Sequence, residues 1–108
     1  MGGSEAHAAP SCRLEERGDG RYALVGELGI EVAAAVLRQG TACFRREPRV
    51  EVDLSGVVDA DSAGLAVMIE WTRAARLERR EIVFRAVPRR LADLARIGGV
   101  DSLLPLAD

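Results

Sequence analysis

The spacing of hydrophobic residues changes along this 108-residue chain, and this change constrains the fold more than any other feature. Residues 49–54 alternate polar with apolar side chains, which is typical of a half-buried strand. By contrast, Val32, Val36 and Phe44 lie at multiples of four, which places them on one stripe of an amphipathic helix. Strands joined through helices predict a partly parallel sheet with helices packed on it.

Applied to the whole chain, the same criteria predict the element order β-β-α-β-α-β-α. Strands are expected at 12–17, 22–25, 49–54 and 81–86, with a hairpin turn at 18–20 and loops at 26–29 and 55–61. Helices are expected at 31–45, at 62–78 and from Pro88 to Gly98, followed by an apolar tail at 100–106. Gly40 weakens the first helix, but Phe44 continues its apolar stripe, so we expect the helix to pass Gly40.

The length and the composition, 48% apolar and 30% charged, indicate one globular domain. Residues 1–11 are small, polar and aperiodic, so we predict a disordered leader there and a single domain over 12–108. The longest apolar run is too short to span a bilayer, and no segment resembles a signal peptide, so we expect a cytoplasmic protein. Cys12 and Cys43 are too few for a disulfide framework and are interpreted as buried thiols.

Every basic residue is an arginine, and the charge is distributed unevenly. Residues 1–72 hold seven arginines and twelve acids, a net charge of −5, whereas 73–96 hold eight arginines and three acids, a net charge of +5. Such a stretch could contact nucleic acid, lipid headgroups or an acidic protein. Nucleic acid is disfavoured because the stretch lacks aromatic platforms beyond Phe84 and because the pI is near 5.5. A solvated helix face is the simpler interpretation.

The residues needed for catalysis or for holding a cofactor are missing from the sequence. Its only histidine, His7, lies in the leader, so neither Ser62 nor a cysteine has a partner base. The chain contains no lysine, which excludes Schiff-base chemistry and a P-loop. Asp53, Asp59 and Asp61 could gather around a divalent cation, but loop acids more often cap helices and turns. We therefore predict a protein that is not an enzyme and holds no metal or cofactor.

The corner before the second predicted helix combines Asp59, Asp61 and Ser62. We expect Ser62 to be the N-cap, with the aspartates complementing the helix dipole. The corner could serve only this structural role, or it could also be a surface where a partner docks.

The second predicted helix has an unusually wide apolar arc. Val67 and Trp71 extend its core stripe sideways, so the arc covers more than one sheet face needs. Trp71 could pack under the neighbouring helix. Alternatively, Trp71 and Val67 could belong to a protein interface, where an aromatic anchor is typical.

Three segments, in the expected strand and helix order, closely resemble the STAS domain pattern. They are Val52–Ser55, Asp61–Ala66, which contains Gly64, and Leu94–Val100. The resemblance extends over about residues 12–106. It implies an α/β fold with a four- to five-stranded mixed sheet flanked by about three helices, and a protein that docks onto partners without catalysing a reaction.

Within the family, the chain is most similar to the MlaB type, the small cytoplasmic subunit of an ABC transporter of phospholipids. Residues 64–71, 83–88 and 99–105 carry this likeness. It implies a subunit that binds and regulates the transporter ATPase, peripheral at the inner membrane, within a complex that also holds permease and substrate-binding subunits. It also implies partner-binding or regulatory roles for Asp59, Asp61, Ser62, Gly64, Val67 and Trp71.

Another branch of the family offers an alternative function. Anti-sigma-factor antagonists are switched by phosphorylation of the matching serine, which makes Ser62 a candidate phosphorylation site.

Overall fold

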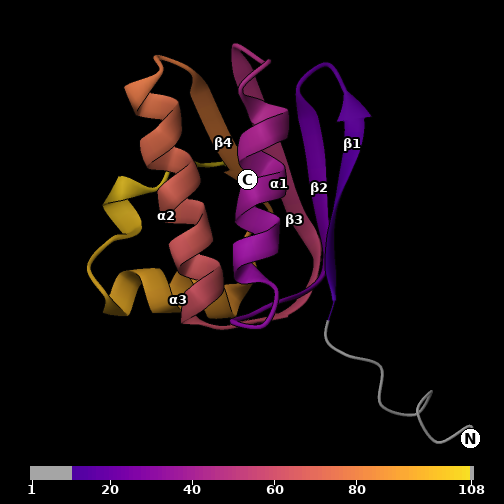
Figure 1. Cartoon of the computed structure of the whole chain (residues 1–108). Coiled ribbons are helices and arrows are strands. Elements are labelled where there is room, and N and C mark those ends of the chain that lie inside the picture. Colours follow the sequence, from indigo (N-terminus) through magenta and orange to yellow (C-terminus); the bar gives the residue numbers. More distant parts are fainter. Residues whose placement is uncertain (1–10, 108) are drawn as a thin grey trace, which may run out of the picture.

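The computed structural model describes residues 11–107, which form a mixed five-stranded sheet with helices α1 and α2 side by side on one face (Figure 1). The elements are β1 (Cys12–Gly18), β2 (Arg21–Leu28), α1 (Ala33–Phe44), β3 (Arg49–Ala60), α2 (Ser62–Leu77), β4 (Glu81–Arg85), α3 (Arg89–Ile97), a 3₁₀ turn (Asp101–Leu103) and β5 (Leu106–Ala107). The predicted fold class, a mixed sheet with three helices, is confirmed. The predicted leader lies outside the described residues, apart from Ser11.

The strands lie in the order β1-β2-β3-β4-β5 across the sheet. β1 and β2 form the predicted antiparallel hairpin, and the other neighbouring pairs are parallel. Parallel pairing requires a crossover, which α1 supplies between β2 and β3, and α2 between β3 and β4. As a result, the carboxyl ends of β2 and β3 and the first residues of α1 and α2 meet at one edge of the molecule (Figure 1).

The core lies between the helices and the sheet, and strand alternation explains its composition. Every second residue of β3 from Val50 to Leu54 is buried, together with Tyr22, Leu24 and Leu28 of β2. A row of three aromatic rings connects the sheet to both helices. Phe44 packs edge-on against Tyr22 at 4.9 Å between ring centroids and against Trp71 at 5.0 Å.

α1 continues past Gly40 to Phe44, as predicted. Gly40 is buried, and a Cβ atom built on it would overlap the indole of Trp71. The absence of a side chain at this position therefore lets α1 and α2 approach closely, which offsets the helix propensity that glycine lacks.

Several predicted boundaries are wrong. β2 extends through residues 26–28, and β3 extends through 55–60, where loops were expected. The Ser55–Gly56 pair indicates a turn by its composition, but the β2–β3 ladder absorbs it as irregularities in register, as a β-bulge does. The expected tail at 100–106 contains a 3₁₀ turn and enters the short strand β5 beside β4.

The two cysteines are half-buried rather than buried. Burial nevertheless raises the pKa of the Cys12 thiol. Within residues 11–107, no helix is both long and apolar enough to cross a membrane.

Candidate docking site

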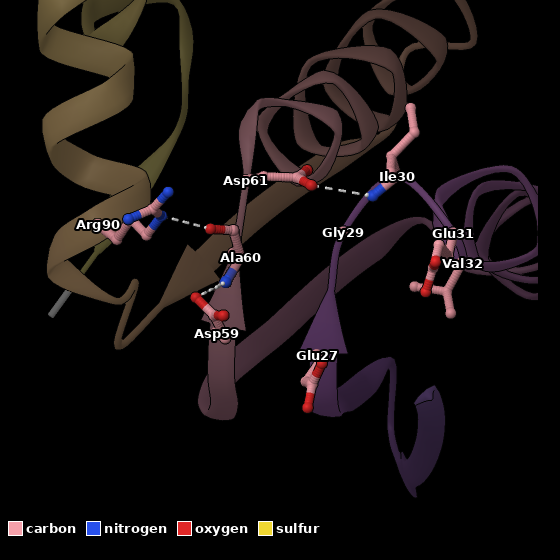
Figure 2. Close-up of a pocket in the computed structure, with 9 residues that line it drawn as sticks. All are labelled: Glu27, Gly29, Ile30, Glu31, Val32, Asp59, Ala60, Asp61 and Arg90. Carbon is pink, nitrogen blue, oxygen red and sulfur yellow. Dashed lines mark hydrogen bonds between the residues drawn. The ribbon is translucent and has the colours of Figure 1, made fainter. Parts of the chain in front are cut away.

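A pocket of about 270 Å³ lies at the edge where β2 and β3 end and the helices begin (Figure 2). Its lining comes from five elements or the loops beside them, and consists of Glu27, Gly29, Ile30, Glu31, Val32, Asp59, Ala60, Asp61 and Arg90. The two crossovers bring these residues together, so the pocket is a product of the sheet topology.

Asp61 holds this corner in shape. Its Oδ1 accepts a hydrogen bond from the Ala63 amide at 2.8 Å, which caps α2. Its Oδ2 accepts from the Ile30 amide at 3.1 Å, in the loop before α1 (Figure 2). One carboxylate therefore fastens the beginnings of two helices to each other.

The prediction that Ser62 caps α2 is wrong, because Asp61 occupies that position and Ser62 is the first residue of the helix. Asp61 has the extended backbone conformation of an N-cap, and its carboxylate is a competent acceptor. Ser62 is exposed, and its hydroxyl forms no hydrogen bond among the described residues. The hydroxyl is thus available to a partner or a modifying enzyme.

Gly64 is a packing residue beneath the corner. A Cβ atom at this position would lie 2.6 Å from the carbonyl oxygen of Leu28, so only glycine lets α2 rest on the end of β2. The glycine thereby places Ser62 beside the pocket without offering a side chain to a partner.

The interface interpretation of Val67 and Trp71 is wrong for this structure, because their exposed fractions are only 3% and 2%. Trp71 packs under the neighbouring helix, and its Nε1 donates a hydrogen bond to the Leu37 carbonyl oxygen at 3.2 Å. The wide apolar arc of α2 is explained by contact with α1 on one side and the sheet on the other.

The pocket holds acidic side chains without a described ion pair, and one arginine. Glu27, Glu31 and Asp59 form no ion pair among the described residues, and Glu27 stands directly opposite Asp59 in the β2–β3 ladder. Arg90 lies in the same pocket, but its Nε donates to the Ala60 carbonyl oxygen at 2.6 Å (Figure 2). The sequence does not single out Arg90, whose only signal is its place in the arginine-rich segment shortly after Pro88.

The three aspartates considered as cation ligands are each engaged locally. Asp53 accepts from the Ser55 amide, Asp59 from the Ala60 amide and Asp61 from the Ala63 amide. Across residues 11–107, no group of three or more histidine, cysteine or acidic residues is placed to hold a metal ion.

The sequence matches a family model described as "Mlab, STAS domain" over residues 12–105. The chain belongs to the STAS domain family. The matching model is of the MlaB type, as the residue patterns predict. Among curated proteins, no sequence matches this STAS domain significantly.

Solved structures share the fold of this STAS domain. A protein from Thermotoga maritima is 16% identical with a TM-score of 0.72, and the match covers 90% of this chain and 86% of that one. An anti-sigma factor antagonist from Mycobacterium paratuberculosis is 22% identical with a TM-score of 0.62, covering 91% and 85%. The phosphorylated form of the Bacillus cell fate determinant SpoIIAA is 14% identical with a TM-score of 0.66, covering 91% and 92%. At these identities the likeness establishes the fold.

Proposed function

We propose that this STAS domain is a non-enzymatic subunit that binds and regulates the cytoplasmic ATPase of an ABC transporter of phospholipids. The match to the MlaB-type model across residues 12–105 carries this proposal. The subunit is then peripheral at the inner membrane, and the permease and substrate-binding subunits complete the complex. Its role is to sustain lipid asymmetry of the outer membrane.

The corner around Ser62 is the surface that best supports docking. It combines an exposed hydroxyl with a pocket and with Ile30, whose side chain is 75% exposed. Asp61 and Gly64 make this surface rigid from below, which reduces the ordering cost of association.

Co-expression with the cognate ATPase subunit tests the proposal. We expect the two proteins to co-purify in stable stoichiometric amounts, and we expect removal of the STAS subunit to lower ATPase activity. An ATPase that purifies alone, with full activity, would contradict the proposal.

Ser62→Asp tests whether the corner is the interface. The added carboxylate must be desolvated on docking, so we expect binding to be lost while the melting temperature stays near that of the wild type. Ser62→Ala is the matched control, and we expect it to bind. Wild-type affinity in Ser62→Asp would place the interface elsewhere.

A second candidate function is a phosphorylation-switched antagonist of an anti-sigma factor. The free and exposed hydroxyl of Ser62 favours it, since a kinase could reach that oxygen. Incubation with ATP and the candidate anti-sigma kinase should then add one phosphoryl group at Ser62, absent in Ser62→Ala. We expect no mass increase; a clean modification would reverse the order of the two candidates.

A further inference from the structure

We infer that the docking face is electrically polarised, acidic on the α1 side and basic at the start of α3, and that the partner carries the opposite order of charges. The acidic half consists of Glu27, Glu31 and Asp59, and the basic half of Arg89 and Arg90. Asp61 lies between Arg90 and Glu31 in the view of Figure 2. This inference rests on the proposed function and specifies how the ATPase docks.

The acidic half is unneutralised in a chain that has abundant arginine. Elsewhere in the described residues, arginines pair with Glu15, Glu51, Glu70, Glu78, Glu81 and Asp93. Among residues 11–107, no arginine pairs with Glu27, Glu31 or Asp59, although Glu27 and Asp59 place like charges at paired positions of the β2–β3 ladder. A basic group of the partner placed between Glu27 and Asp59 removes that repulsion on binding.

The basic half is not neutralised, and one of its two guanidinium groups is held in place. The Ala60 carbonyl oxygen fixes the guanidinium of Arg90 through Nε, which leaves the terminal nitrogens without a described partner. Arg89 is exposed and has no described ion pair, since the nearby Asp93 pairs with Arg96 at 2.8 Å. A fixed guanidinium presents the planar donor set that binds a carboxylate.

Ile30 indicates that the occupant is a protein surface. Its largely exposed side chain lines the pocket beside the carboxylates, where an inorganic cation would gain nothing from it. A folded partner covers Ile30 while its charged side chains meet the two halves. The order of charges then fixes the orientation in which the partner docks.

Paired charge reversals separate polarisation from simple net-charge attraction. One double variant carries Glu27→Lys and Glu31→Lys, and the other carries Arg89→Glu and Arg90→Glu. For each we measure the rate of association with the ATPase at low and at high salt. A partner attracted only by net charge would respond to the two variants in opposite directions. A polarised face predicts that both variants associate at least about tenfold more slowly than the wild type at low salt. High salt should reduce this difference in rate between variant and wild type.

Arg45→Glu with Arg46→Glu is the matched control, because these exposed residues lie at the far end of α1. We expect less than about a twofold change from it. The single variants Glu31→Lys and Arg89→Glu, which break no described hydrogen bond, repeat the test if a double variant folds poorly. If the folded variants respond in opposite directions or not at all, while the wild-type protein binds the ATPase, the polarisation is overturned and the proposed function remains intact. If the wild-type protein does not bind the ATPase, both are overturned.

Discussion

The backbone of Gly40 in α1 lies directly against the indole ring of Trp71 in α2. The same indole donates a hydrogen bond to the Leu37 carbonyl oxygen, one turn earlier in α1. Trp71 therefore sets the spacing of the two helices that cover the sheet.

Gly40→Ala should destabilise the protein although alanine is the better helix former. The new methyl group overlaps the indole, and overpacking of this kind costs about 1–3 kcal/mol, which outweighs a propensity gain of about 1 kcal/mol. Urea unfolding measures the net loss. In a Trp71→Phe background, which removes the indole atoms nearest Gly40, the same change should become stabilising. If Gly40→Ala lowers the free energy of unfolding in both backgrounds, the contact with the indole is not the cause of the loss.

Trp71→Ala should lower the free energy of unfolding by about 3–5 kcal/mol, since it empties the space between the helices and removes a satisfied indole. The milder Trp71→Phe variant should lower the melting temperature less. Its affinity for the ATPase, corrected for the folded fraction, should match the wild type. Reduced affinity of fully folded Trp71→Phe for the ATPase would show that Trp71 contributes to the interface.

Asp61→Ala should cost about 0.5–2 kcal/mol of stability through the lost cap, whereas Ser62→Ala should cost less than about 0.5 kcal/mol. Asp61→Asn separates the two functions of the carboxylate. Its single carbonyl oxygen can cap α2, but its amide group cannot accept from Ile30. We therefore expect intermediate stability and faster amide hydrogen exchange at Ile30. An effect of Ser62→Ala larger than that of Asp61→Ala would restore Ser62 as the cap.

Stability should fall at alkaline pH because of Tyr22. Burial, followed by the nearby Glu16 and Glu47, raises the pKa of Tyr22 to about 12, whereas an unfolded tyrosine ionises near about 10. Between these values the unfolded chain releases a proton that the folded chain retains, so the free energy of unfolding decreases as pH rises. The chain has no lysine and no other tyrosine, and the Cys12 thiol, whose pKa is also raised, is present in both proteins that are compared below. Tyr22→Phe should unfold with a weaker pH dependence from pH 10 to 12.

The fold was predictable from the sequence where the spacing of hydrophobic residues agrees with the residues that begin and end an element. Strand β4 and helices α2 and α3 lie close to their predicted ranges, because each has a clear period and a clear beginning. The extended conformation of residues 55–60 was not predictable, because their composition indicates a turn while pairing with β2 keeps them extended. Pairing between strands that a helix separates is a tertiary effect, and local composition does not record it.

The site was predictable only in its location. Asp59, Asp61 and Ser62 do lie at one corner, but two adjacent residues could each cap α2, and only geometry selects Asp61. The burial of Trp71 depends on the glycine across the helix interface, which no pattern within α2 shows. Arg90 reaches the corner because α3 follows β4 back toward the end of β3.

The docking face draws on chain segments from Glu27 to Arg90, which gives it a consequence for biosynthesis. The β1–β2 hairpin is local, but the parallel pairs and the placement of α3 need almost the whole chain. A nascent chain emerges from the ribosome beginning with its N-terminus, so the hairpin can form outside the ribosome long before Arg90 has emerged. A partner that recognises this face would therefore accept only a finished domain, and truncated products would be left out of the proposed complex.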